Sequence, residues 1–191
     1  MLHIQPFRYR IIDGLFDPSI IRSAAESWPD ADWPHWILYD SAEQTKKTCN
    51  VPFYMPVAVR QLTSELLAMP VGELLGLGTL IPDPSLHAGG MHRIWPGGSV
   101  GNHLDADSHP LILWTRRANA ILYVNQCDGG ELMLGNECSI EPRPGRLVLF
   151  ECSDKSFHGV LPVTAGCRSS IMSCWWSVGT GSRLKAEFSA R

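Results

Sequence analysis

His103 and Asp105 are separated by one residue, and a pair with this spacing can bind a metal ion. On an extended strand, the side chains at i and i+2 project from the same face, so Leu104 would point the other way. A third ligand must come from elsewhere, and His158 lies in a segment that also has strand character. Two neutral imidazoles and one carboxylate on one face leave coordination positions open, as in oxygen-activating non-haem iron sites.

Arg168 opens the apolar segment 168–176, which also has strand character. A guanidinium on such a strand is costly to bury without a partner, and its planar fork matches a carboxylate. Ser170 shares the face of Arg168, since it lies two residues further on, and it can donate a hydrogen bond to the same carboxylate. The pattern therefore indicates a position that binds an organic acid.

Helices are predicted in the first part of the chain and short strands in the second. After a strand at 7–12, Asp17 and Pro18 supply an N-cap and a first helical residue, so 18–28 should be helical, as should 56–69 and a short segment after Pro70. The later strands are predicted at 91–95, 111–114, 118–125, 131–134, 146–150, 157–163 and 168–178. Short, evenly spaced strands favour a sandwich or barrel.

Composition limits the classes of function. The 191 residues, 45% of them hydrophobic, suit one domain, and a net charge of −3 without a basic run gives no general attraction to nucleic acid. No apolar run approaches a membrane span, and no signal peptide is apparent, so we expect a cytoplasmic protein whose six cysteines are reduced. The tryptophan-rich segment 28–36 is predicted to be irregular, either packed or acting as a substrate lid. The oligomeric state stays open.

Further segments occur in an order that resembles a known family. Tyr123-Val-Asn is followed by Gly129-Gly-Glu-Leu, then by Ile140-Glu-Pro and Gly145-Arg-Leu-Val-Leu-Phe. Together with His103-x-Asp105, His158 and Arg168-x-Ser170, they make the stretch from about 89 to 176 resemble the Fe(II)- and 2-oxoglutarate-dependent dioxygenases, in their prolyl-4-hydroxylase-like branch. The resemblance implies a mainly β fold, with a double-stranded β-helix (jelly-roll, cupin-like) core at about 89–178 and helical support at about 15–80, in a single domain 1–191.

The resemblance also implies roles for individual residues. The expected iron ligands are His103, Asp105 and His158, and the expected residues around 2-oxoglutarate are Arg168, Ser170, Tyr123 and Leu132, with Arg168 pairing with the distal carboxylate. Fe(II), 2-oxoglutarate and O2 are the implied cofactor and co-substrates, with ascorbate as a candidate stimulant. The implied reaction is hydroxylation of an unactivated C–H bond, with release of succinate and CO2.

The substrate is the least determined part of this interpretation. His92, Arg93, Trp95 and Arg117 are candidate substrate contacts, because they lie on predicted strands near the ligands or could pair with an acid. A chain without an added binding domain favours a small amino-acid-type molecule or natural-product intermediate. One alternative is a prolyl hydroxylase acting on a peptide or protein. Another is a non-catalytic cupin-like metal- or ligand-binding module, although in such modules the triad or the arginine is usually incomplete.

Overall fold

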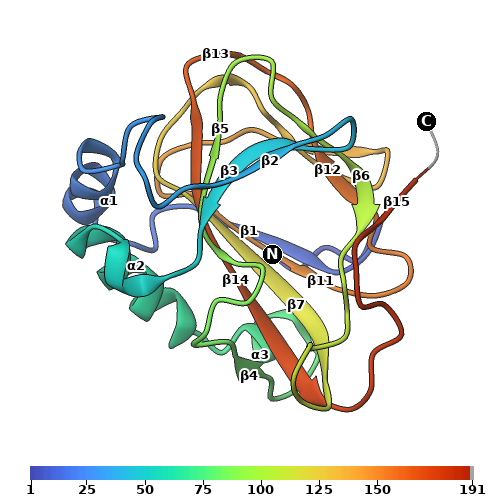
Figure 1. Cartoon of the computed structure of the whole chain (residues 1–191). Coiled ribbons are helices and arrows are strands. Elements are labelled where there is room, and N and C mark those ends of the chain that lie inside the picture. The colour runs from blue at the N-terminus through green and yellow to red at the C-terminus, as the bar shows by residue number, and fades with distance from the viewer. Residues whose placement is uncertain (190–191) are drawn as a thin grey trace.

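The computed structural model describes residues 1–189, and Figure 1 shows its helices and strands. The helices are α1 (Pro18–Glu26), α2 (Val57–Leu67) and α3 (Val71–Leu75), with a 3-10 turn η1 (Pro52–Tyr54). The strands are β1 (Tyr9–Ile12), β2 (Ile37–Asp40), β3 (Thr45–Cys49), β4 (Ile81–Pro82), β5 (Gly90–Ile94), β6 (Val100–Leu104), β7 (Trp114–Tyr123), β8 (Asp128–Gly129), β9 (Leu132–Leu134), β10 (Cys138–Ile140), β11 (Leu147–Glu151), β12 (His158–Val160), β13 (Val163–Ala165), β14 (Arg168–Val178) and β15 (Glu187–Phe188).

Antiparallel strands form two main sheets, which together make the core. Within residues 1–189 the larger sheet has the order β1-β11-β7-β14-β5-β3-β2, with β4 paired to β14, and the smaller has the order β10-β9-β12-β6-β15. In Figure 1, β6, β12 and β15 lie on the right, across from β5 and β14 of the larger sheet. This mainly β architecture with a few helices confirms the predicted double-stranded β-helix fold.

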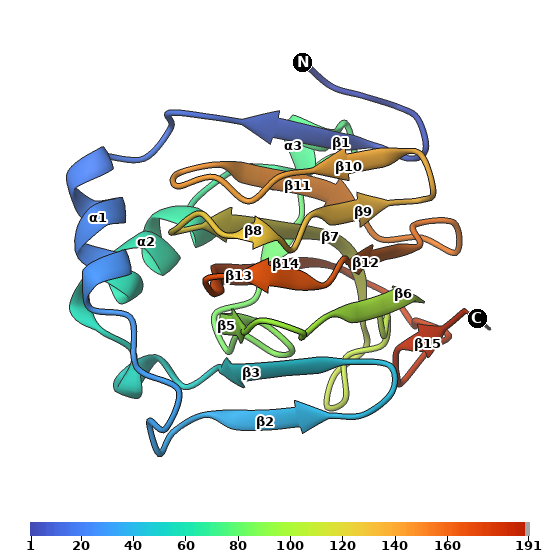
Figure 2. The same cartoon turned by 90° about the horizontal axis from the view of Figure 1, so that it is seen from above.

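The larger sheet has two different faces because side chains alternate along its strands. Leu122 of β7 and Ile171 of β14 belong to the core that includes residues of α1, α2 and α3. Their chain neighbours Tyr123 and Met172 belong to a second cluster that also includes residues of β9 and β10 in the smaller sheet. Figure 2 shows α1 and α2 gathered at one end of the strands. The helices thus support the larger sheet, and its inner face is available for a site.

The helix signals read from the sequence are confirmed, with slightly shorter helices. Asp17 caps α1, since its Oδ1 accepts a hydrogen bond from the backbone N of Ser19 at 2.7 Å, and Pro18 is the first helical residue. Ile21 and Ala24 are the buried residues of this helix. No helix within residues 1–189 combines the length and the apolar character needed to cross a membrane.

Two strand predictions were wrong. The apolar segment 111–114 was predicted to be a strand, but it forms bends, with Leu111 87% exposed, and β7 begins only at Trp114. The predicted strand 157–163 is two strands, because Pro162 has no N–H to donate to a sheet. β12 therefore ends at Val160 and pairs with β6 and β9, whereas β13 starts at Val163 and pairs with β8.

We expect the packing of α2 on the sheet to make a large contribution to stability. Leu62 is fully buried in the core beneath α2, so Leu62→Ala should lower the free energy of unfolding by about 2–5 kcal/mol. Val57 lies in the same helix with 71% of its surface exposed, and Val57→Ala should change that free energy by less than about 0.5 kcal/mol. Urea denaturation followed by circular dichroism measures both. Equal effects of the two substitutions would contradict this role of α2.

Candidate active site

His103 and His158 face each other across two paired strands. They are direct partners in the antiparallel pairing of β6 with β12, and their ring centroids are 4.3 Å apart. Asp105 follows the end of β6; its Oδ1 lies 3.5 Å from Nε2 of His103 and its Oδ2 lies 3.6 Å from Nε2 of His158. One ligand atom from each residue lies within 4.8 Å of the others, so the three side chains form a compact set that can bind a metal ion.

The tautomer of each histidine is set by a backbone carbonyl. Nδ1 of His103 lies 2.9 Å from the carbonyl oxygen of Gly101, and Nδ1 of His158 lies 3.0 Å from that of Ser156. Since a carbonyl only accepts, each Nδ1 carries the proton and each Nε2 presents its lone pair toward Asp105. Burial lowers the pKa of His158 to about 4, which keeps its imidazole neutral. Both rings are therefore prepared to bind a cation.

Asp105 is held ionised although only 14% of its side-chain surface is exposed. Burial by itself raises the pKa of a carboxyl group, but nearby positive charge keeps the pKa of Asp105 well below its usual value, and with His158 neutral that charge is the guanidinium of Arg116. Nη1 of Arg116 lies 3.4 Å from Oδ2, and Nδ2 of Asn119 donates a hydrogen bond to the same oxygen at 2.5 Å. An oriented carboxylate beside two neutral imidazoles is a donor set that fits Fe(II).

Arg168 is buried, with 2% of its surface exposed, and its neighbours are neutral acceptors. It donates hydrogen bonds to the carbonyl oxygen of Gly130 (3.1 Å), to Oγ of Ser170 (3.2 Å) and to Oη of Tyr123 (3.1 Å). No carboxylate among residues 1–189 lies within ion-pair distance of it. A guanidinium has five N–H donors, so donors remain, and a buried charge without a counter-ion fits an organic acid.

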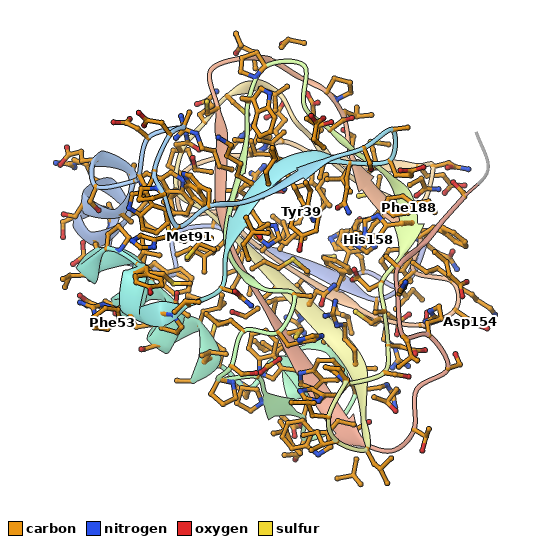
Figure 3. The ribbon with its side chains drawn as sticks, in the orientation of Figure 1. Tyr39, Phe53, Met91, Asp154, His158 and Phe188 are labelled. Atoms are coloured by element: carbon orange, nitrogen blue, oxygen red, sulfur yellow. The ribbon has the colours of Figure 1, made fainter. Side chains whose placement is uncertain are left out.

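One cavity of about 350 Å³ joins these features. Its wall includes His103, Asp105 and His158 as well as Arg168, so a ligand bound to Arg168 can also reach the metal-binding set. Ser170, Leu132 and His92 also line it, whereas Tyr123 is connected to it through the hydrogen bond to Arg168. Figure 3 labels three wall residues from different strands, namely Tyr39 of β2, His158 of β12 and Phe188 of β15.

Three of the predicted substrate contacts lie outside this cavity wall. Arg93 alternates with His92 on β5 and instead donates hydrogen bonds to the carbonyl oxygen of Pro29 and to Sγ of Cys167. Trp95 is half-buried but does not line the cavity, and Arg117 is exposed on β7. Of the predicted substrate residues, His92 alone is part of the described wall, so the cavity does not support a substrate role for the other three.

The sequence interpretation missed a polar row on β3 and its ends. Gln44, Lys46, Thr48 and Asn50 all line the cavity. They occupy every second position, which places them on one face of an extended strand. The alternation of these residues is visible in the sequence, but the segment 44–50 is too polar to be recognised as a strand of a sheet. Arg116, the chain neighbour of Arg117, is buried beside Asp105.

Comparisons with known proteins agree with this geometry. A family model described as the 2OG-Fe(II) oxygenase superfamily matches residues 89–177. A search of curated protein sequences finds no match. Among solved structures, a Pseudomonas putida prolyl-4-hydroxylase has a TM-score of 0.65 at 21% identity, covering 90% of this chain and 93% of that one.

Two further prolyl hydroxylases share the fold. The enzyme of Trichoplax adhaerens, solved with a peptide fragment of the hypoxia inducible factor oxygen degradation domain, has a TM-score of 0.64 at 17% identity, covering 88% of this chain and 83% of that one. The viral collagen prolyl hydroxylase of Paramecium Bursaria Chlorella virus-1 has a TM-score of 0.59 at 15% identity, covering 89% and 96%. These structures show the fold, and the family match over residues 89–177, the β-core that carries the His-Asp-His set, identifies this region as a 2OG-Fe(II) oxygenase dependent on 2-oxoglutarate.

Proposed function

We propose that this dioxygenase hydroxylates an unactivated C–H bond of a small amino-acid-type substrate, with release of succinate and CO2. The observation that carries the proposal is the single cavity that contains both the His-Asp-His set and the unpaired Arg168. A volume of about 350 Å³ is near the lower end for ligand pockets, and it must hold 2-oxoglutarate together with the group to be oxidised. This limited space favours a small substrate.

In this proposal His103, Asp105 and His158 hold Fe(II), and their arrangement on one side of the ion leaves positions for 2-oxoglutarate and O2. When bound, the iron and 2-oxoglutarate supply the oxidising chemistry. Arg168 binds the distal carboxylate of 2-oxoglutarate, with its guanidinium oriented by Ser170 and Tyr123. Leu132, Ile121 and Met172 are among the apolar residues of the wall and would restrict water around the bound acid.

The proposed iron site can be tested by removing one ligand. His103→Ala should lower the Fe(II) affinity by at least about a hundredfold and abolish succinate formation, because two ligands cannot replace three. His35 lies outside the cavity and stacks on Tyr54, with the two ring centroids 3.8 Å apart, so His35→Ala should bind Fe(II) like the wild type. Anaerobic calorimetric titration measures the affinity. Wild-type succinate formation by His103→Ala would show that the site has been assigned wrongly.

The proposed acid-binding role of Arg168 has a separate test. Arg168→Met removes a charge-assisted contact, so the Kd for 2-oxoglutarate should rise by about tenfold to a hundredfold, measured by titration in the presence of Mn(II). Arg143 is an exposed arginine paired with Glu141, so Arg143→Met is a matched control that should keep the wild-type Kd. An unchanged Kd in Arg168→Met would mean that another residue holds the acid.

Hydroxylation of prolyl residues in a peptide or protein is the second candidate, and the likeness to three prolyl hydroxylases supports it. Succinate formation with free L-amino acids, including L-proline, can be compared with that for proline-containing peptides blocked at both ends. We expect the free amino acids to stimulate succinate formation and to gain one oxygen atom by mass spectrometry. Stimulation and oxygen gain only with the blocked peptides would favour the peptide hydroxylase instead.

A further inference from the structure

The cavity wall carries more positive than negative charge. In the described part of the chain, its permanent cations are Lys46, Arg116 and Arg168, and its one carboxylate belongs to Asp105. Arg116 already pairs with Asp105. A bound Fe(II) adds two positive charges and a bound 2-oxoglutarate adds two negative ones, so loading the site leaves the surplus in place. The wall therefore favours another anion.

Lys46 is the cation whose side chain has no hydrogen-bonding or ionic partner among residues 1–189. Its ammonium lies over the ring of Tyr39, whose centroid is 5.4 Å from Nζ. Burial lowers the pKa of Lys46 to about 8, against the longer-range attraction of Asp105. The ammonium group is thus partly removed from water without compensation from the protein, which is a cost that a bound anion would offset.

Strand β3 places Lys46 in the cavity wall and its chain neighbour Lys47 outside it. Lys46 pairs with Tyr39 of β2, and both residues line the cavity. Lys47 points to the other face of β3, where its Nζ donates a hydrogen bond to the carbonyl oxygen of Ala31. Gln44 and Thr48 lie on the cavity face on either side of Lys46 and can donate further hydrogen bonds to a polar ligand.

We infer that Lys46 binds a carboxylate of the primary substrate, so that the enzyme acts on a small free acid and not on an internal residue of a peptide. This inference rests on the proposed function, in which Arg168 is occupied by 2-oxoglutarate. An internal residue of a peptide has no free main-chain carboxylate, so a peptide without an acidic side chain at this point would leave the ammonium of Lys46 without a counter-ion while covering it from water. A free amino acid or hydroxy acid neutralises it and fixes the direction of the substrate relative to the metal-binding set.

The test compares wild type, Lys46→Met and Lys47→Met. The probes are free L-amino acids and small hydroxy acids, each beside its own carboxamide, together with proline-containing peptides blocked at both ends. We expect the wild type to form succinate in response to one or more free acids and not to their carboxamides. Lys46→Met should raise the KM for such an acid by at least about tenfold, the effect of losing one charge-assisted hydrogen bond. Lys47→Met should keep the wild-type KM.

Two controls separate this role from others. The Kd for 2-oxoglutarate, measured with Mn(II), should stay within about threefold of wild type in Lys46→Met, since Arg168 holds that acid. The melting temperature of Lys46→Met should be maintained or raised, because the substitution removes a partly buried charge that has no partner. A lower melting temperature would indicate that Lys46 has a structural role.

Several results would overturn the inference. They are equal stimulation by acids and carboxamides, stimulation by blocked peptides alone, no response to any free acid, and a loss of 2-oxoglutarate affinity in Lys46→Met that matches the loss for the acid. The last result would assign Lys46 to the co-substrate. A wild-type protein that does not bind 2-oxoglutarate at all would instead contradict the proposed function, and the Mn(II) titration detects that failure separately.

Discussion

The site depends on the direct pairing of His103 with His158 in adjacent antiparallel strands. Residues opposite one another in such a pair have Cβ atoms about 5 Å apart, so two imidazoles there converge without help from a loop. The close approach of the strands requires Gly159, because a Cβ at that position would lie 2.9 Å from the carbonyl oxygen of Val100. With Asp105 just past the end of β6, backbone pairing fixes the metal-binding set on the inner face of the smaller sheet. The larger sheet, which faces this one, then needs to supply only the proposed acid-binding group, Arg168, in the wall of the same cavity.

The two buried arginines of the larger sheet differ in the charge of their neighbours. Arg116 is neutralised by Asp105 and lies 5.3 Å from the ring of Trp176, so it helps to hold a metal ligand in its ionised form. Arg168 is surrounded by neutral acceptors, which fix the direction of the guanidinium but leave its charge uncompensated. A protein that only needed a stable core would gain from pairing or replacing Arg168. The contrast agrees with the proposal that Arg116 stabilises the protein itself whereas Arg168 binds an organic acid.

Short-range signals in the sequence predicted much of this arrangement. The spacing of His103 and Asp105, the capping residue Asp17 and the long strand that begins at Arg168 all depend on neighbours within a few residues. Predictions failed where distant contacts or one residue's backbone chemistry decide the structure. The apolar residues 111–113 resemble a strand, yet in the described structure no strand pairs with them, and Pro162 divides a segment that otherwise appears continuous. The strand β3 is polar, and it joins the sheet only through pairing with β2 and β5, so its contribution to the cavity could not be predicted from local pattern.

The two walls of the cavity differ in how firmly neighbouring strands hold their backbone. His103, His158 and Arg168 lie on strands in the interior of their sheets, where neighbours on both sides fix the backbone. The wall formed by β2 and β3 lies at the edge of the larger sheet, and β2 itself is exposed. Residues there can change with little effect on the position of iron or 2-oxoglutarate, so the edge is where selectivity for the substrate can be adjusted independently of the reaction. Among the described residues the fold gives the ammonium of Lys46 the ring of Tyr39 but no hydrogen-bonding or ionic partner, which supports the inference that this charge serves a bound substrate.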